Sequence, residues 1–335
     1  MRNLTALFVA LFLIVLGFLL ISFIPKPNQN AFPVKYGVSF SPRYARYLKL
    51  DFQKTFLQIL DELKVKNFRL PTYWTSLQSQ EGKYDFSETD FMIDEAGKRG
   101  ARIILVVGAR QPRWPECHYP DWAKKLSVSS RQQKTLEFVG KVVERYKDSS
   151  AIWAYQVENE PFAWWFGENC DPPDAKFLQS EVDLVKKLDP KKPIVITDSG
   201  ELGFWVESIS NADILGSSVY RKSYNTVLHA HIPYPFPVSY YQLKANLVKK
   251  LPGQQNKKIL ITELQAEPWL SGTGGEEATP LGQARLFTLE EFKNNLEFVK
   301  KIGFEEDYLW GVEWWYFMKE NGYSEYLEYA KELFK

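Results

Sequence analysis

Two acids and an amide stand together where an apolar stretch of the sequence ends. Residues 151–157 are mostly apolar, and Glu158, Asn159 and Glu160 follow them directly. Carboxylates are costly to bury without partners, so a cluster of this kind at the end of an apolar run is typical of a functional site. A later apolar run ends in the same way, at Glu263.

Two carboxylates that face each other can cleave a glycosidic bond. One protonates the leaving oxygen, and the other attacks the anomeric carbon or activates water. Glu160 and Glu263 are 103 residues apart, which corresponds to about three strand–helix units of about 35 residues each. A solvated strand end would explain one acid pair, but it does not explain a second strand that ends in Glu. We therefore predict that Glu160 and Glu263 are catalytic.

Strands and helices alternate along the chain in the way that would bring these two acids together. Short apolar runs predict eight strands, and three- and four-residue spacing of apolar positions predicts helices between them. The predicted strands are residues 35–41, 67–74, 101–108, 151–159, 192–199, 212–220, 257–264 and 308–317. The predicted helices are residues 51–65, 90–100, 132–146, 176–189, 239–251, 284–303 and 323–335.

This alternation favours an α/β fold, a closed (β/α)8 TIM barrel over residues 36–335. An open doubly wound sheet is the alternative, but no G-x-G-x-x-G follows the first strand. In a parallel barrel the carboxyl ends of the strands share one rim, where chemistry takes place. Other side chains at these ends are candidates for substrate binding, although each aromatic one could equally belong to the core: Arg69, Trp74, Trp114, His118, Asn159, Tyr220, Trp314 and Trp315.

The motifs resemble those of the clan A glycoside hydrolases. "NEP" at 159–161 and "ITEL" at 261–264 are similar to the acids that end strands four and seven in that clan, and "FRLPTYW" and "GKYDFSETDFMIDEAGKRG" resemble families 5, 39 and 42. These families include cellulases, β-mannanases and β-glycosidases with retaining (β/α)8 domains. The resemblance implies that Glu160 is the acid/base, that Glu263 is the nucleophile, and that Asn159 holds the sugar 2-hydroxyl.

The same resemblance assigns supporting roles to two further residues. It implies that Arg69 supports the nucleophile and that Tyr220 contacts it. The sixth predicted strand departs from family 5, because Ser218 stands where that family has the His of a His-x-Tyr motif. We expect no cofactor and no metal, since the chain has only two cysteines and three histidines and lacks an HExxH motif.

The two cysteines, Cys117 and Cys170, follow neighbouring predicted strands. An even number of cysteines in an exported protein favours a disulfide, and two free thiols are the alternative. A bond between these residues would brace one wall of the site.

The N-terminus predicts membrane attachment. Residues 4–24 are uncharged and overwhelmingly apolar, and as a helix they would span roughly 30 Å, which is enough for a bilayer core. We predict a membrane anchor in residues 1–24, a linker in 25–35 and an extracytoplasmic hydrolase domain in 36–335. A cleaved signal peptide and a secreted enzyme are the alternative.

Three functions are compatible with these features. The first is a retaining glycosidase acting on a β-linked oligo- or polysaccharide. The second is a transglycosidase of envelope glycan that uses the same residues, and the third is a non-catalytic glycan-binding barrel. A net charge of +1 gives no basic field for nucleic acid, and we expect a monomer.

Overall fold

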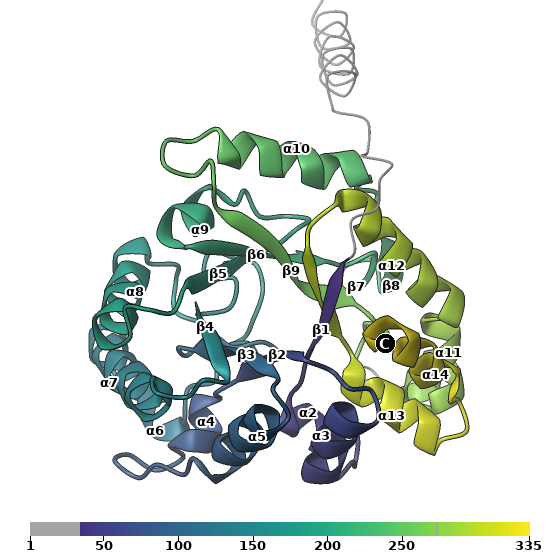
Figure 1. Cartoon of the computed structure of the whole chain (residues 1–335), viewed down its shortest axis with the longest axis horizontal. Coiled ribbons are helices and arrows are strands. Elements are labelled where there is room, and N and C mark those ends of the chain that lie inside the picture. The colour runs from purple at the N-terminus through teal and green to yellow at the C-terminus, as the bar shows by residue number, and fades with distance from the viewer. Residues whose placement is uncertain (1–33, 273) are drawn as a thin grey trace, which may run out of the picture.

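Eight parallel strands close into a barrel. The computed structural model describes residues 34–272 and 274–335, and the barrel order is β1-β10-β9-β6-β5-β4-β3-β2 (Figure 1). The predicted (β/α)8 barrel is thus confirmed. Its strands are β1 (Lys35–Ser39), β2 (Asn67–Pro71), β3 (Arg102–Val107), β4 (Ile152–Val157), β5 (Ile194–Asp198), β6 (Ile214–Val219), β9 (Lys258–Gln265) and β10 (Glu306–Trp310).

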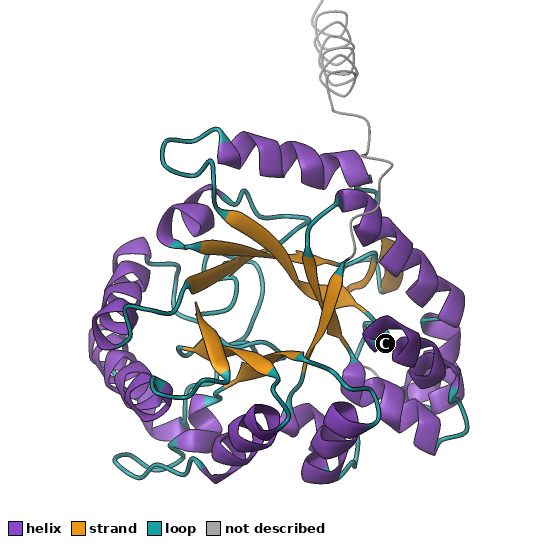
Figure 2. Ribbon diagram, viewed as in Figure 1, coloured by secondary structure: helices purple, strands orange, loops and turns teal. Residues whose placement is uncertain are grey.

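Helices surround the barrel on its outside (Figure 2). The α-helices are α2 (Pro42–Tyr47), α3 (Phe52–Asp61), α4 (Trp74–Leu77), α5 (Ser87–Lys98), α6 (Asp121–Lys124), α7 (Val128–Tyr146), α8 (Ala175–Leu188), α9 (Val206–Asn211), α10 (Val238–Lys249), α11 (Pro280–Leu286), α12 (Leu289–Ile302), α13 (Val312–Glu320) and α14 (Glu325–Lys331). Two short 3₁₀ helices are η1 (Gly275–Ala278) and η2 (Glu332–Phe334). An antiparallel hairpin, β7 (Lys222–Asn225) and β8 (Ala230–Pro233), was not predicted.

The strands alternate between two apolar clusters. On β3, Ile103 and Leu105 pack in the large cluster that includes the helices, whereas Ile104 belongs to a small cluster formed by six strands. Because successive strand residues point to opposite faces, the small cluster fills the inside of the barrel. The neighbours of Arg69 on β2, Phe68 and Leu70, pack in the large outer cluster. The Arg69 side chain therefore points to the inside of the barrel.

Two predicted elements differ most from the structure. The predicted helix 284–303 is two helices, because Thr288 begins α12 with a capping box that it forms with Glu291. The predicted strand 308–317 ends at Trp310. Gly311 follows with φ 131°, and a Cβ there would lie 2.7 Å from the Cβ of Glu267. The chain turns at this glycine and continues as α13.

That turn corrects the assignment of Trp314 and Trp315. Both lie on α13 with no exposed surface, and their indole N–H groups donate to Gln283 and to the carbonyl of Ala266. Trp74 is also fully buried, where it stacks on Phe138. These three tryptophans belong to the core and present no exposed surface to a substrate.

Strand β9 carries one extra residue beside Glu263. Ser217 and Ser218 of β6 pair with Ile261 and Glu263, so Thr262 has no partner there. The register with β10 shifts over the same residues. Such a bulge turns the following side chain toward a different face, and it accounts for a polar Glu263 inside a strand of apolar residues.

The predicted disulfide is confirmed. Cys117 and Cys170 are bonded, with their Cα atoms 5.2 Å apart. The bond joins the loop after β3 to the loop after β4. Since both loops leave the carboxyl ends of their strands, the bond lies at the same end of the barrel as Glu160.

The predicted anchor, residues 4–24, lies outside the described residues. Within residues 34–272 and 274–335, no helix is both long enough and apolar enough to cross a bilayer.

The core position of Trp314 predicts a large effect on stability. Trp314→Ala should lower the free energy of unfolding by about 3–5 kcal/mol, because it leaves a cavity and removes a buried hydrogen bond. Trp164→Ala, at a side chain that is 77% exposed, should change it by less than about 1 kcal/mol. Urea denaturation measures both, and equal small losses would contradict the core assignment.

Candidate active site

The end of β4 forms an unusual turn. Glu158 and Glu160 both have positive φ, 58° and 43°, a conformation that costs free energy in residues other than glycine. The Glu158 carboxylate accepts hydrogen bonds from the backbone N–H groups of Ala109 (2.8 Å) and Arg110 (2.5 Å). Glu158 therefore ties this turn to the loop after β3, whereas the Glu160 carboxyl contacts Ser218 of β6.

Asn159 is at the centre of a buried hydrogen-bond network. Its Oδ1 accepts from Arg69 Nη2 at 2.6 Å, from Gln156 Nε2 at 3.2 Å and from Thr197 Oγ1 at 3.2 Å. Because a guanidinium can only donate, the atom that faces Arg69 must be the amide oxygen. The amide nitrogen then faces Glu116, to whose Oε2 it donates at 2.9 Å.

Glu263 receives hydrogen bonds on both carboxylate oxygens. Arg69 Nη1 donates to Oε1 at 2.7 Å, and the Tyr220 hydroxyl donates to Oε2 at 2.8 Å. Arg69 has no exposed surface and Glu263 is 7% exposed. These contacts hold the carboxylate in one orientation at the mouth of the barrel.

Glu160 lies in a setting that favours its protonated form. Burial raises the pKa of this carboxyl well above its usual range, and the negative charges of Glu263 and Glu116 raise it further. Ser218 Oγ donates to its Oε1 at 3.0 Å, and the Glu160 backbone N–H donates to Thr197 Oγ1 at 2.8 Å. A protonated acid beside an oriented carboxylate is the arrangement that acid-assisted displacement requires.

Glu201, after β5, supports the residues next to this pair. Its carboxylate accepts from the Tyr220 backbone N–H and from the Tyr241 hydroxyl, both at 2.8 Å. Burial raises the pKa of Glu201 to about 7. Its bond to the Tyr220 backbone helps fix the tyrosine that contacts Glu263.

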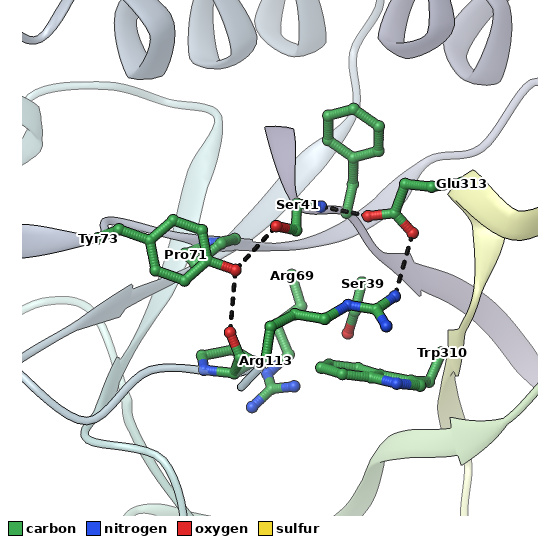
Figure 3. Close-up of a pocket in the computed structure, with 10 residues that line it drawn as sticks. Ser39, Ser41, Arg69, Pro71, Tyr73, Arg113, Trp310 and Glu313 are labelled. Carbon is green, nitrogen blue, oxygen red and sulfur yellow. Dashed lines mark hydrogen bonds and ion pairs between the residues drawn. The ribbon is translucent and has the colours of Figure 1, made fainter. Parts of the chain in front are cut away.

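A second ionic cluster lies beside Arg69. The Arg113 guanidinium lies 3.6 Å from the ring centre of Tyr44 and 4.1 Å from that of Trp310, and it pairs with Glu313 at 3.3 Å and with Glu267. Figure 3 shows Arg113 extending over Trp310 toward Glu313. Trp310 ends β10 and lines a pocket together with Arg69 and Arg113. The tryptophan at the mouth of the barrel is therefore Trp310, and not Trp314 or Trp315.

Aromatic rings lead from Glu263 toward the surface. Tyr220 contacts Trp269 (ring centres 5.1 Å apart), Trp269 contacts Phe166 (5.8 Å) and Phe166 contacts Trp114 (5.6 Å). We call these four residues the aromatic row. Trp114 is 53% exposed, so the row ends in a ring that solvent or a ligand can reach.

His118 is not part of this site. It is 1% exposed and packs against Tyr73, with ring centres 4.4 Å apart. Its Nδ1 lies 3.2 Å from Arg43 Nη1, and its Nε2 lies 3.0 Å from the Arg113 carbonyl oxygen. These partners fit a neutral ring that accepts at Nδ1 and donates from Nε2. His118 thus supports the backbone of Arg113 and presents almost no surface to a substrate.

The structure brings together five of the predicted residues and adds others. Arg69, Asn159, Glu160, Tyr220 and Glu263 converge, and Trp114 lies at the end of the aromatic row. Several polar side chains of the site were not predicted from the sequence: Glu116, Arg113, Gln156, Thr197 and Glu201. Gln156 and Thr197 lie near the ends of β4 and β5, and the other three lie in the loops after β3 and β5. A polar residue near the carboxyl end of a strand was therefore the available signal.

Fold and site together define a class of protein. A (β/α)8 barrel with one carboxylic acid after β4 and a second, hydrogen-bonded carboxylate on β9 has the architecture and acid pair of glycoside hydrolases. Residues 28–263 match the family described as Cellulase (glycosyl hydrolase family 5), and the chain belongs to this family. The resemblance to clan A is thereby confirmed.

Similar proteins cover between about a third and most of the chain. A β-galactosidase LacZ of Lactobacillus acidophilus is 28% identical over 133 residues, which are 35% of this chain and 20% of the relative. The chain thus spans about a fifth of that protein's length. Among solved structures, GH5_18 from Bifidobacterium longum has a TM-score of 0.60 at 13% identity and covers 83% of this chain and 70% of that one.

A family 39 glycoside hydrolase from Bacteroides cellulosilyticus has a TM-score of 0.52 at 15% identity, and covers 86% of this chain and 58% of that one. At these identities the two structures support the fold alone.

The environment of His118 predicts a pH-dependent stability. Burial lowers the pKa of His118 to about 4 from 6.5, so the unfolded chain binds the extra proton first. The stabilisation by neutral His118 is complete above pH 6.5 and is lost as the pH falls toward 4.

Between pH 7 and pH 5 this loss should be about 2 kcal/mol. His118→Gln keeps an acceptor and a donor but does not titrate, so its free energy of unfolding should fall by correspondingly less over this range. Urea denaturation at both pH values measures the difference. Parallel losses in the two proteins would contradict a buried neutral His118.

Proposed function

We propose that this chain hydrolyses O-glycosidic bonds of a β-linked glycan with retention of configuration. One observation carries the proposal. The buried Arg69 guanidinium bonds both Glu263 and Asn159, the residue before Glu160, so a single side chain fixes the two catalytic acids relative to each other. The curated relatives named β-galactosidase support a β-linked substrate.

The reaction proceeds by double displacement. Glu263 attacks the anomeric carbon as the bond to the leaving oxygen breaks, and Glu160 gives its proton to that oxygen. The leaving alcohol departs, and an ester joins the sugar to Glu263. Water then attacks the anomeric carbon, Glu160 takes a proton from it, and Glu263 is released as a carboxylate.

Four neighbours assist these steps. The Asn159 amide nitrogen has a second N–H, which would donate to the sugar 2-hydroxyl as the family resemblance implies. Arg69 and Tyr220 keep Glu263 oriented for attack. Ser218 donates to Glu160 where family 5 has a histidine, so a hydroxyl holds the acid in place of an imidazole.

The aromatic row supports an oligo- or polysaccharide as the substrate. Flat rings bind the apolar faces of sugars, and Trp114 ends the row in an exposed position. The loop 161–170 carries Trp164 and Trp165, and its sole charged residue is Glu168. An aromatic loop with a single charged residue directly follows Glu160, and it suits neutral sugar units on the leaving-group side.

The two acids predict different mutant behaviour. Glu263→Gln should lower kcat by at least about 10³-fold on every glycoside, because no glycosyl-enzyme can form. Glu160→Gln should retain turnover of substrates with good leaving groups, and azide should restore its rate by attacking the glycosyl-enzyme. The rates of both variants on aryl β-glycosides whose leaving groups differ in pKa, with and without azide, measure this difference.

Glu207→Gln, at an exposed position on α9, is the matched control and should have wild-type rates. Equal losses in the Glu160 and Glu263 variants without azide rescue would contradict the assigned roles. Glycosyl transfer to added sugar in preference to water would instead favour a transglycosidase. An inactive wild-type chain that still binds oligosaccharide would favour a non-catalytic barrel.

We also propose that residues 4–24 anchor the hydrolase domain to a membrane, outside the cytoplasm. The proposal rests on the length and uncharged composition of this segment. The linker that follows would hold the barrel within about 20 Å of the bilayer. Glycans of the cell's own envelope would then be the accessible substrates.

The anchor predicts the distribution of the protein. The full chain expressed in a bacterial host should fractionate with membranes and resist carbonate extraction, because an apolar spanning helix is held by the bilayer core. A chain that begins at Phe32 should appear in the supernatant. Protein in the medium with a mature N-terminus beyond residue 20 would instead indicate a cleaved signal peptide.

A further inference from the structure

A third carboxyl lies inside the candidate site beside Asn159. Glu116 belongs to the loop after β3 and is 5% exposed. Its Oε2 accepts from Asn159 Nδ2 at 2.9 Å, and within the described residues this is the one side-chain hydrogen bond of its carboxyl. Neither the two-acid chemistry nor the fold itself accounts for an acid here.

The position of Glu116 is unfavourable for an acid. Burial raises the pKa of Glu116 to about 7, Arg110 opposes this effect, and the charge of Glu263 adds to it. Its backbone also has a positive φ of 70°. An apolar residue without a positive φ would avoid both the burial of an acid and the backbone strain. Features that cost free energy in this way are concentrated at functional sites.

The two loops hold Glu116 firmly in this position. The next residue, Cys117, is bonded to Cys170, and the Glu168 backbone N–H donates to the Pro115 carbonyl at 3.0 Å. Gly167 packs so closely that a Cβ there would lie 3.1 Å from the Cβ of Glu116. The disulfide thus joins the loop that carries Glu116 to the loop that follows Glu160.

Glu116 completes the orientation of the Asn159 amide. Arg69, Gln156 and Thr197 all donate to Oδ1, which fixes the oxygen end. Glu116 accepts one of the two N–H bonds at the nitrogen end. The planar amide then has one direction left for its second N–H, and a displacement of that group would misalign it with a bound sugar.

We propose that Glu116 is a positioning residue, which aims the free N–H of Asn159 at the 2-position of the sugar and so sets the preference for substrates with a 2-hydroxyl. This inference rests on the proposed function, because it assigns to Glu116 a part in that reaction. Glu116 acts through Asn159 and does not touch the reacting atoms.

The test compares an aryl glycoside with its 2-deoxy analogue. The measured quantity is the ratio of their kcat/KM values, which is high when Asn159 bonds the 2-hydroxyl. Glu116→Ala should lower the ratio by about tenfold, as expected for the loss of one well-placed hydrogen bond. Glu116→Gln keeps an acceptor for Asn159 and should preserve the ratio.

Four further variants sharpen the result. Asn159→Ala should lower the ratio on its own, and adding Glu116→Ala should lower it no further, because both changes remove the same interaction. Glu168→Gln, an exposed acid in the joined loop, is the matched control and should keep the wild-type ratio. If Glu116→Ala does not fold, Glu116→Asp, which withdraws the carboxyl by one methylene, should lower the ratio.

Equal losses on both substrates in folded Glu116→Ala or Glu116→Asp would overturn the proposal, as would additive effects in the double variant. A wild-type chain without glycosidase activity would refute the proposed function instead. Crystal structures would then decide the positioning role by themselves. The Asn159 amide should keep its orientation in Glu116→Gln and lose it in Glu116→Ala or Glu116→Asp, and an unmoved amide in the latter variants would also overturn the proposal.

Discussion

The candidate site depends on one buried guanidinium. Arg69 has no exposed surface and donates to acceptors on two other strands and the turn after β4: Gln156, Asn159 and Glu263. A buried cation is tolerated when its donors are satisfied and an opposite charge lies close to it. The planar, forked geometry of arginine meets three acceptors at fixed angles, which a lysine could not do. Because these acceptors come from β4, its following turn and β9, which are not neighbours of β2 in the barrel, the site requires the closed barrel.

Local patterns in the sequence predicted the parts that local physics determines. Apolar runs followed by amphipathic helices predict a barrel of eight units, and the carboxyl ends of those runs place Glu160 and Glu263 on one rim. The disulfide was predictable for the same reason, since Cys117 and Cys170 follow adjacent strands. Each of these inferences needs only the periodicity of the chain and the rule that parallel strands share their carboxyl ends.

The rest depends on contacts between distant residues. Trp310 ends β10 and lines a pocket with Arg69, whereas Trp314 and Trp315 lie on α13. This difference follows from the turn at Gly311, where Ala266 and Glu267 approach closely. The extra residue at Thr262 appears only when β9 is paired with its neighbours. His118 resembles a site residue by position, yet Arg43 and the Arg113 backbone occupy both of its nitrogens. No pattern in the sequence encodes these partners.

The acids of the barrel mouth differ in role because their neighbours differ. Glu158 accepts backbone N–H groups, Glu263 accepts from a cation and a phenol, and Glu313 accepts from the Ser41 N–H and pairs with Arg113. Glu160 and Glu116 lie close to other carboxylates, and burial raises the pKa of both. Burial also raises the pKa of Glu158 and of Glu313, although their hydrogen-bond donors oppose this effect. Backbone donors thus hold Glu158 and Glu313, whereas Glu160 and Glu116 lie in loops beside other carboxylates. Changes in these loops can therefore retune the chemistry while the barrel stays the same.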